Sequence, residues 1–197
     1  VVTPATARGN AYINLISTCA TNLNGTSSER DSDNIGVVSV GQPPEFELEK
    51  TFSGTDVQAG TGNVPEISPS KKLTVNILAR NKGLGASRAV TITDFLNTLD
   101  MKDFVYVNNS AKLTGVGKIE YTNDGTTWSA NETQPVAGIR AVADSVAPGA
   151  ELKLTFDLQT PDKDLGVRNN IATLKSSLIE LIDTAQIKVS FKPLIAL

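Results

Sequence analysis

The segment Leu152-Lys153-Leu154-Thr155-Phe156-Asp157-Leu158-Gln159 alternates apolar and polar side chains without interruption. Successive side chains of a β-strand point to opposite faces, so this spacing predicts a strand with one buried and one wet face. The same period of two recurs in residues 46–49, 73–77, 89–93, 139–142 and 187–192. We therefore expect an all-β fold built mainly from antiparallel strands.

Turns that contain glycine separate these segments. Residues 81–85 (Asn-Lys-Gly-Leu-Gly), 123–125 (Asn-Asp-Gly) and 148–149 (Pro-Gly) are predicted to place residues at positive φ. Turns that recur every 8–15 residues or so are typical of a β-sandwich or barrel. Helix is expected only as short turns, in residues 94–104 with Asp94 as N-cap, and in residues 176–183.

The amino-acid composition argues against several classes of function for this chain. The chain has 197 residues, of which 40% are hydrophobic, which is enough for one large sandwich with an appendage. A net charge of −3 provides no basic stripe for nucleic acid. Histidine is absent, which removes the usual general base and the commonest metal ligand. We expect no enzyme, no cofactor, no metal site, no nucleic-acid partner and no membrane span, since no apolar run approaches the roughly 18 residues of a transmembrane helix.

Several local patterns allow a chemical interpretation that we do not favour. Asp31-Ser32-Asp33-Asn34 has the alternating oxygens of a Ca²⁺ loop but lacks its glycine and distal glutamate, so a solvated hairpin tip is preferred. Thr122–Trp128 is similar to the Asp-box turn of glycosidases, but it occurs once, and we expect a tight hairpin anchored by Trp128. Asp162 and Asp164 lie in a loop with no sign of a catalytic cleft.

Two further residue types leave alternatives open. Lys50 could form an intramolecular isopeptide bond with an asparagine, as in some surface sandwiches, although the sequence does not favour this. The single Cys19 cannot form an internal disulfide and is expected to be a buried small side chain. Asn-x-Ser/Thr sequons at Asn24, Asn108 and Asn131 matter only if the organism glycosylates its surface proteins.

The beginning and end of the chain share a pattern. Residues 14–18 and 33–40 are expected to form strand, loop and strand, as are residues 170–174 and 183–189. In both pairs an Asn enters the first strand and an Asp opens the second. We interpret the first forty residues as a surplus copy of the hairpin that closes the main domain. Pro43-Pro44 favours an extended spacer, so we predict an N-terminal extension in residues 1–44 and a β-sandwich in residues 45–197.

Residues 46–191 resemble a known family. The motifs that carry the resemblance are Leu48-Glu49-Lys50-Thr51, Asn81-Lys82-Gly83, Ala89 to Asp94, Ile119 to Trp128, and Ile139-Arg140 followed by Ala147 to Ala150 and Leu154-Thr155-Phe156. Their order is similar to that in the "conserved repeat" β-sandwich family of prokaryotic surface proteins, also called domain of unknown function eleven. The chain lacks the proline usual after Asp94. The resemblance implies an Ig-like sandwich with an architectural role and no catalytic residues.

These features favour a structural subunit of an extracellular filament or pilus. A tethered extra strand suits β-strand addition to a neighbour, and head-to-tail contacts of that kind propagate. We expect residues 11–18 or 35–40 to be the donated strand, and the partners to be copies of the chain or other cell-surface components. The alternative is one repeat module of a large adhesin or S-layer protein, with the N-terminal hairpin closing the preceding repeat.

Two apolar stretches add candidate contact surface, since exposed apolar patches normally mark interfaces. Residues 177–182 are apolar where a hairpin tip should be polar, and residues 193–197 form an apolar tail; either stretch could instead fold back onto the core. The residues expected at the interface are Ala11, Tyr12, Ile13, Leu15, Ile35, Val37, Val38, Val40, Leu178, Ile179, Leu181, Ile182, Leu194, Ile195 and Leu197.

Overall fold

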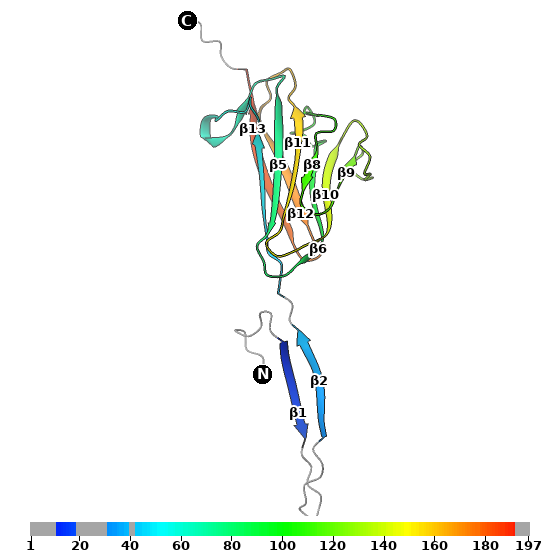
Figure 1. Cartoon of the computed structure of the whole chain (residues 1–197). Helices are drawn as coiled ribbons and strands as arrows, with labels where there is room; N and C mark the ends of the chain where they lie inside the picture. Colours follow the sequence, from blue (N-terminus) through cyan, green and yellow to red (C-terminus); the bar gives the residue numbers. More distant parts are fainter. Residues whose placement is uncertain (1–10, 19–30, 40–41, 192–197) are drawn as a thin grey trace, which may run out of the picture. The chain divides into compact units, whose positions relative to one another are not determined.

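The structure, a computed structural model, describes residues 11–18, 31–39 and 42–191, the first two ranges by their backbone alone. The chain divides into two units, Val1–Gln42 and Pro43–Leu197. In the first unit, β1 (Ala11–Thr18) and β2 (Asp31–Ser39) form a two-stranded antiparallel sheet (Figure 1). The prediction of an all-β chain with an N-terminal hairpin is therefore confirmed.

The second unit is an Ig-like sandwich of two sheets. The five-stranded sheet has the order β3 (Phe46–Ser53), β5 (Lys72–Asn81), β11 (Glu151–Gln159) and β7 (Val105–Tyr106), with β8 (Lys112–Thr114) also on β11. The six-stranded sheet has the order β4 (Glu66–Ile67), β13 (Glu180–Val189), β12 (Gly166–Lys175), β6 (Ser87–Phe95), β10 (Gly138–Val146) and β9 (Lys118–Thr122). A short 3-10 turn, η1, spans Thr61–Asn63. Among the strands that the structure describes, only β4 and β13 pair in parallel.

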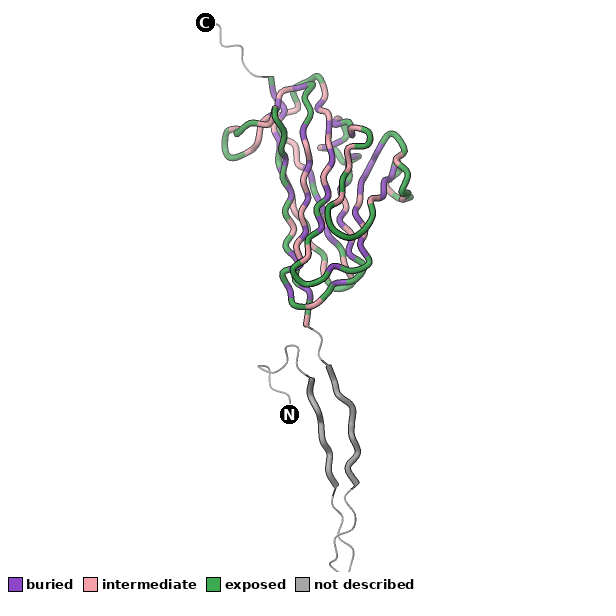
Figure 2. The backbone as a smooth tube through the Cα atoms, viewed as in Figure 1, coloured by how far each residue is buried: buried purple, intermediate pink, exposed green. Residues whose placement is uncertain are grey.

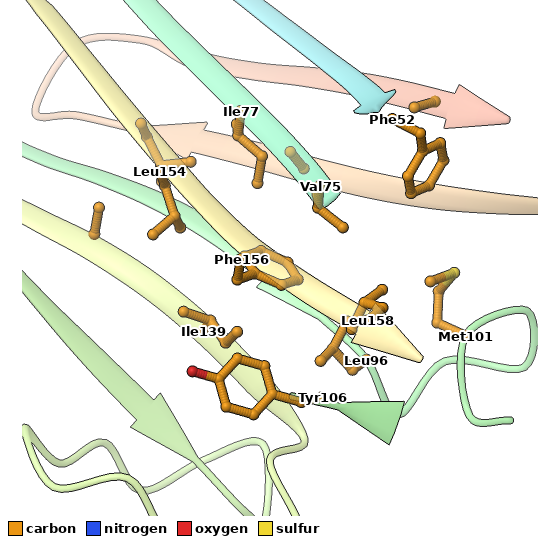
Figure 3. Packing of buried hydrophobic residues seen from close by; sticks show 14 of the residues in the cluster. Phe52, Val75, Ile77, Leu96, Met101, Tyr106, Ile139, Leu154, Phe156 and Leu158 are labelled. Atoms are coloured by element: carbon orange, nitrogen blue, oxygen red, sulfur yellow. The ribbon is translucent and has the colours of Figure 1, made fainter. Parts of the chain in front are cut away.

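The core lies between the two sheets and follows the predicted alternation. Along β11, Leu152, Leu154, Phe156 and Leu158 have no exposed surface, whereas Lys153 is exposed. Figure 2 shows the same alternation of buried and exposed positions along other long strands of the sandwich. Phe156 packs among Val75 and Ile77 of β5 and Ile139 of β10 (Figure 3). Burial of these apolar side chains is the main force that holds the sheets together.

The two helical turns predicted from the sequence are wrong. Asp94 and Phe95 end β6, where Asp94 pairs with both Ile139 and Ala172 instead of capping a helix, and residues 96–104 form bends and turns in which Lys102 N–H donates to Thr98 C=O at 2.9 Å. Residues 176–179 form a tight turn, closed by Ser176 N–H donating to Ile179 C=O at 2.8 Å, and β13 follows. In both places, pairing with distant strands outweighs local helix preference.

The turn glycines are of two kinds. Gly125 (φ 79°) and Gly149 (φ 74°) have the predicted positive φ. Gly83 does not, and the prediction for residues 81–85 is wrong there: Gly83 is needed because a Cβ would lie 2.3 Å from the Glu45 nitrogen, where the chain enters the sandwich. The fully buried side chain of Asn81 stabilises the backbone at this point. Its oxygen accepts hydrogen bonds from Glu45 N–H (3.2 Å) and Gly83 N–H (3.1 Å). Its nitrogen donates to Gly85 C=O (2.9 Å) and Val146 C=O (3.1 Å).

Candidate functional site

Three polar side chains lie inside the apolar core. Lys50 on β3 is 4% exposed, and Asp94 on β6 and Asn170 on β12 are fully buried. Each occupies an inward position next to buried apolar residues of its own strand, as Lys50 does between Phe46 and Phe52. Charged side chains are almost never fully buried unless they are paired, so this cluster is exceptional within the sandwich.

The cluster joins the two sheets. Lys50 Nζ contacts Asp94 Oδ2, and Asn170 Nδ2 donates to the same oxygen at 3.2 Å. The backbone N–H of Lys50 donates to Asp183 Oδ2 at 2.6 Å. Since β3 belongs to one sheet and β6, β12 and β13 to the other, these polar contacts cross the apolar layer.

Two oxygens of the cluster lack hydrogen-bond partners. Asp94 Oδ1 and Asn170 Oδ1 are buried, and neither contacts a donor among the described residues. A buried polar atom without a partner costs about 1–3 kcal/mol. As an ordinary buried ion pair, the cluster is therefore incompletely satisfied.

Burial shifts the pKa values of Lys50 and Asp94 in the directions that favour their uncharged forms. Desolvation lowers the pKa of Lys50, against the opposing attraction of Asp94 and of Asp183. Desolvation also raises the pKa of Asp94, against the opposing effects of Lys50 and Asn170. A low-dielectric site disfavours both charges, so burial shifts the pair in the direction of an uncharged amine and an uncharged carboxylic acid. Because all three side chains are shielded from solvent, their chemistry is confined to one another.

The sequence pattern indicates only parts of this cluster. It gives Lys50 no specific partner residue, it predicts a helix cap at Asp94, and it marks Asn170 and Asp183 only as residues near the starts of strands. The available signal was a polar residue in the apolar register of a strand, as in Phe46, Leu48, Lys50 and Phe52. The pattern does not reveal that the three polar positions meet, because strand pairing brings them together.

The N-terminal hairpin shares its register with the hairpin that closes the sandwich. In β12 and β13, Ala172, two residues after Asn170, pairs with Asp183. In β1 and β2, Ile16, two residues after Asn14, pairs with Asp33. The two hairpins therefore place an Asn and an Asp at matching positions. This register also places Asp31–Asn34 in β2, opposite residues 15–18, and not at a hairpin tip.

The predicted interface residues fall in three places. Strand β1 contains Ala11, Tyr12, Ile13 and Leu15, and strand β2 contains Ile35, Val37 and Val38. Four more lie outside the described residues: Val40, Leu194, Ile195 and Leu197. In the β12–β13 turn region, Leu178 is 75% and Ile182 is 64% exposed. Ile179 and Leu181 instead pack against the core. That stretch therefore divides between surface and core.

The remaining sequence candidates lie on the surface or outside the described ranges. The sequon residues Asn108 and Asn131 are exposed, and Asn24 and Cys19 lie outside the described residues. In the turn after β9, Asp124 Oδ1 accepts from the backbone N–H groups of Thr126 and Thr127, each at 2.7 Å. These bonds hold the pKa of Asp124 far below its ordinary value.

Trp128 follows this turn. Its ring lies 5.9 Å from that of Phe95, and the Arg140 guanidinium stacks over it at 4.4 Å.

Within the described ranges, no three His, Cys, Asp or Glu side chains gather as a metal site would require. The described helical structure includes nothing of the length and apolarity needed to cross a membrane.

Comparison with known proteins finds a solved structure that shares the fold of this chain, but no sequence match. No protein-family model and no curated protein sequence matches the chain. Among solved structures, a Corynebacterium diphtheriae protein proposed to be membrane anchored is 12% identical, with a TM-score of 0.52 over 96% of this chain and 46% of that protein. The chain thus spans under half of that protein's length. The likeness shows a shared fold.

Two further structures are similar at lower scores. The pilus backbone protein RrgB of Streptococcus pneumoniae is 14% identical, with a TM-score of 0.46 over 67% of this chain and 31% of that protein. A family 123 glycoside hydrolase of Clostridium perfringens is 11% identical, with a TM-score of 0.37 over 73% of this chain and 27% of that enzyme.

Proposed function

We propose that this chain is a structural module of an extracellular cell-surface fibre, in which β-sandwiches are joined through the β1–β2 hairpin. The observation that carries the proposal is the shared register of that hairpin and the closing hairpin β12–β13. A two-stranded sheet alone is marginally stable in water. The hairpin therefore gains most of its stability by adding to the sheet of a sandwich.

The sandwich attached to this hairpin has no vacancy for it at the equivalent place. There, β12 pairs with one edge of β6 and β10 with the other. An acceptor must therefore offer a free sheet edge or lack a closing hairpin of its own. This requirement defines two arrangements of the fibre.

In the first arrangement the acceptor is another copy of the chain. Within the described sandwich, β3 pairs only with β5, so its other edge has no strand partner. Addition of β1 or β2 from a second copy to such an edge gives a head-to-tail contact, which propagates as a filament or pilus. Self-polymerisation is the distinguishing property of this arrangement.

In the second arrangement the hairpin closes a neighbouring sandwich of the same polypeptide. The matching Asn and Asp positions favour it, because they give β1–β2 the pattern of a closing hairpin. The resemblance to the "conserved repeat" family points the same way, towards a module of an adhesin or S-layer protein. The fold shared with a longer Corynebacterium diphtheriae protein proposed to be membrane anchored agrees with a surface location.

Two preparations test the proposal. The filament arrangement predicts that the full chain forms long polymers by light scattering and electron microscopy, whereas residues 43–197 alone stay monomeric. The module arrangement predicts monomers of both. It also predicts that residues 43–163, fused ahead of residue 1, fold into a second protease-resistant sandwich closed by β1–β2. A monomeric full chain together with an unfolded added segment would overturn both arrangements.

A further inference from the structure

We propose that Lys50 and Asn170 become joined by an amide bond, which links the two sheets covalently and forms without any other protein. The inference goes beyond the proposed function and does not depend on how sandwiches associate. It rests on the convergence of a lysine amine, an asparagine amide and a carboxyl group in a core that excludes water.

The first requirement is a nucleophilic amine. Lys50 Nζ contacts Asp94 Oδ2 within the core. Transfer of the ammonium proton to Asp94 leaves a neutral amine with a free electron pair. Burial drives the transfer in that direction, because it penalises both charges of the pair. The same shielding protects the amine from competing solvent.

The second requirement is an activated carbonyl carbon. Asn170 Nδ2 lies 3.2 Å from the Asp94 oxygen that Lys50 also contacts, so amine and amide meet at one atom. A half-turn of the amide about its Cβ–Cγ bond exchanges the positions of its nitrogen and oxygen. In that orientation the protonated Asp94 donates to Asn170 Oδ1 and stabilises the charge that develops there during attack.

The reaction balances without a co-reactant. Lys50 Nζ attacks Asn170 Cγ, forming a C–N bond and a tetrahedral intermediate whose oxygen is held by the Asp94 proton. Nδ2 takes up one proton from the former lysine amine through Asp94 and departs as ammonia when the Cγ–Nδ2 bond breaks. One secondary amide replaces one amine and one primary amide, and Asp94 ends as the carboxylic acid, with the proton that the lysine ammonium gave up before the attack.

The amide product has a lower desolvation cost than the ion pair and gives the buried oxygens better hydrogen-bond partners. Two buried charges are replaced by a neutral amide, which removes a desolvation cost that an ion pair only partly recovers. The amide oxygen gains a donor in Asp94, whereas Asp94 Oδ1 and Asn170 Oδ1 both lack partners beforehand. Asp183, which holds the Lys50 backbone N–H at 2.6 Å, acts as a positioning residue.

The mass of the intact, denatured chain tests the inference. The bond predicts a mass lower than that of the sequence by about 17 Da, the mass of ammonia, and a branched proteolytic peptide containing Lys50 and Asn170. The variants Lys50→Met, Asn170→Ala and the isosteric Asp94→Asn should keep the full mass. Asn169→Ala, which alters the neighbouring asparagine outside the cluster, should lose ammonia as the wild type does.

The wild-type mass decides the outcome without reference to the folding of any variant. A full-mass, folded wild-type chain after prolonged incubation would overturn the inference. Loss of ammonia that persists in Asn170→Ala would locate the modification elsewhere and overturn it too. Loss of ammonia from Asp94→Asn would contradict the role assigned to the Asp94 proton.

Discussion

Lys50 and Asn170 lie in opposite sheets of the sandwich, yet their side-chain nitrogens meet at the same oxygen of Asp94. The contact joins the first strand of the sandwich to the first strand of its closing hairpin. A covalent bond here would carry force across the sandwich without loading the hydrogen bonds between strands. Such a bond would give the buried cluster a mechanical role, which suits the proposed fibre module.

Removal of the cross-link should lower stability strongly. Asn170→Ala is expected to reduce the free energy of unfolding by about 5 kcal/mol, the value that the chain-entropy account gives for closing a loop of roughly 100 residues. The control Asn169→Ala, which loses side-chain bonds to Asp100 and Gln186, should cost about 1 kcal/mol. Denaturant unfolding measures both, and equal losses would contradict the account.

Asn81 should be the most sensitive asparagine outside the cluster. Asn81→Leu removes four side-chain hydrogen bonds, to two backbone N–H groups and two carbonyls, and should destabilise the sandwich by about 3 kcal/mol. Asn76→Ala is the matched control, because it lies on the same strand and bonds the exposed Ser53 hydroxyl. It should change stability by under about 1 kcal/mol. Chemical denaturation distinguishes the two.

The turn at Asp124 should show a defined pH dependence. Its folded pKa lies below the ordinary value of 3.8 because backbone N–H groups bond the charged form. The stabilisation is therefore fully present above that ordinary value and is lost as pH falls through the lower folded pKa. NMR titration should show Asp124 ionised at pH values where free aspartate is protonated. Titration at the ordinary value would contradict the turn geometry.

The matched hairpin registers give a prediction that combines both proposals. In the fusion with residues 43–163 ahead of residue 1, Asn14 should take the place of Asn170 in the added sandwich. The fusion should then lose two molecules of ammonia, or about 34 Da. Asn14→Ala should restore a loss of one. Unchanged loss in Asn14→Ala would show that β1 does not supply the acceptor amide.

Much of the fold follows from local pattern. The alternation in residues 152–159 predicted β11, and the repeated Asn and Asp positions predicted the two hairpins, because a period of two is a direct property of strand geometry. Gly125 and Gly149 followed from turn chemistry. The helix expected after Asp94 failed, since a buried polar residue within a strand has the same local sequence signature as a helix cap.

The buried cluster depends on long-range pairing. Asp94 and Asn170 are brought together because β6 pairs with β12, and Lys50 reaches them from the facing sheet. No local period encodes those pairings, so the sequence offered Lys50 as a candidate without its asparagine or its acid. The position of the hairpin acceptor is likewise a property of tertiary contacts and not of β1 or β2 alone.

Single-molecule stretching tests the central claim most directly. Force applied between the two termini of the chain should unfold the wild-type sandwich without extending the segment between Lys50 and Asn170, because the amide bond carries the load around it. The Asn170→Ala variant should release that whole segment and lengthen accordingly. Equal extension of the wild type and the variant would contradict a covalently locked sandwich.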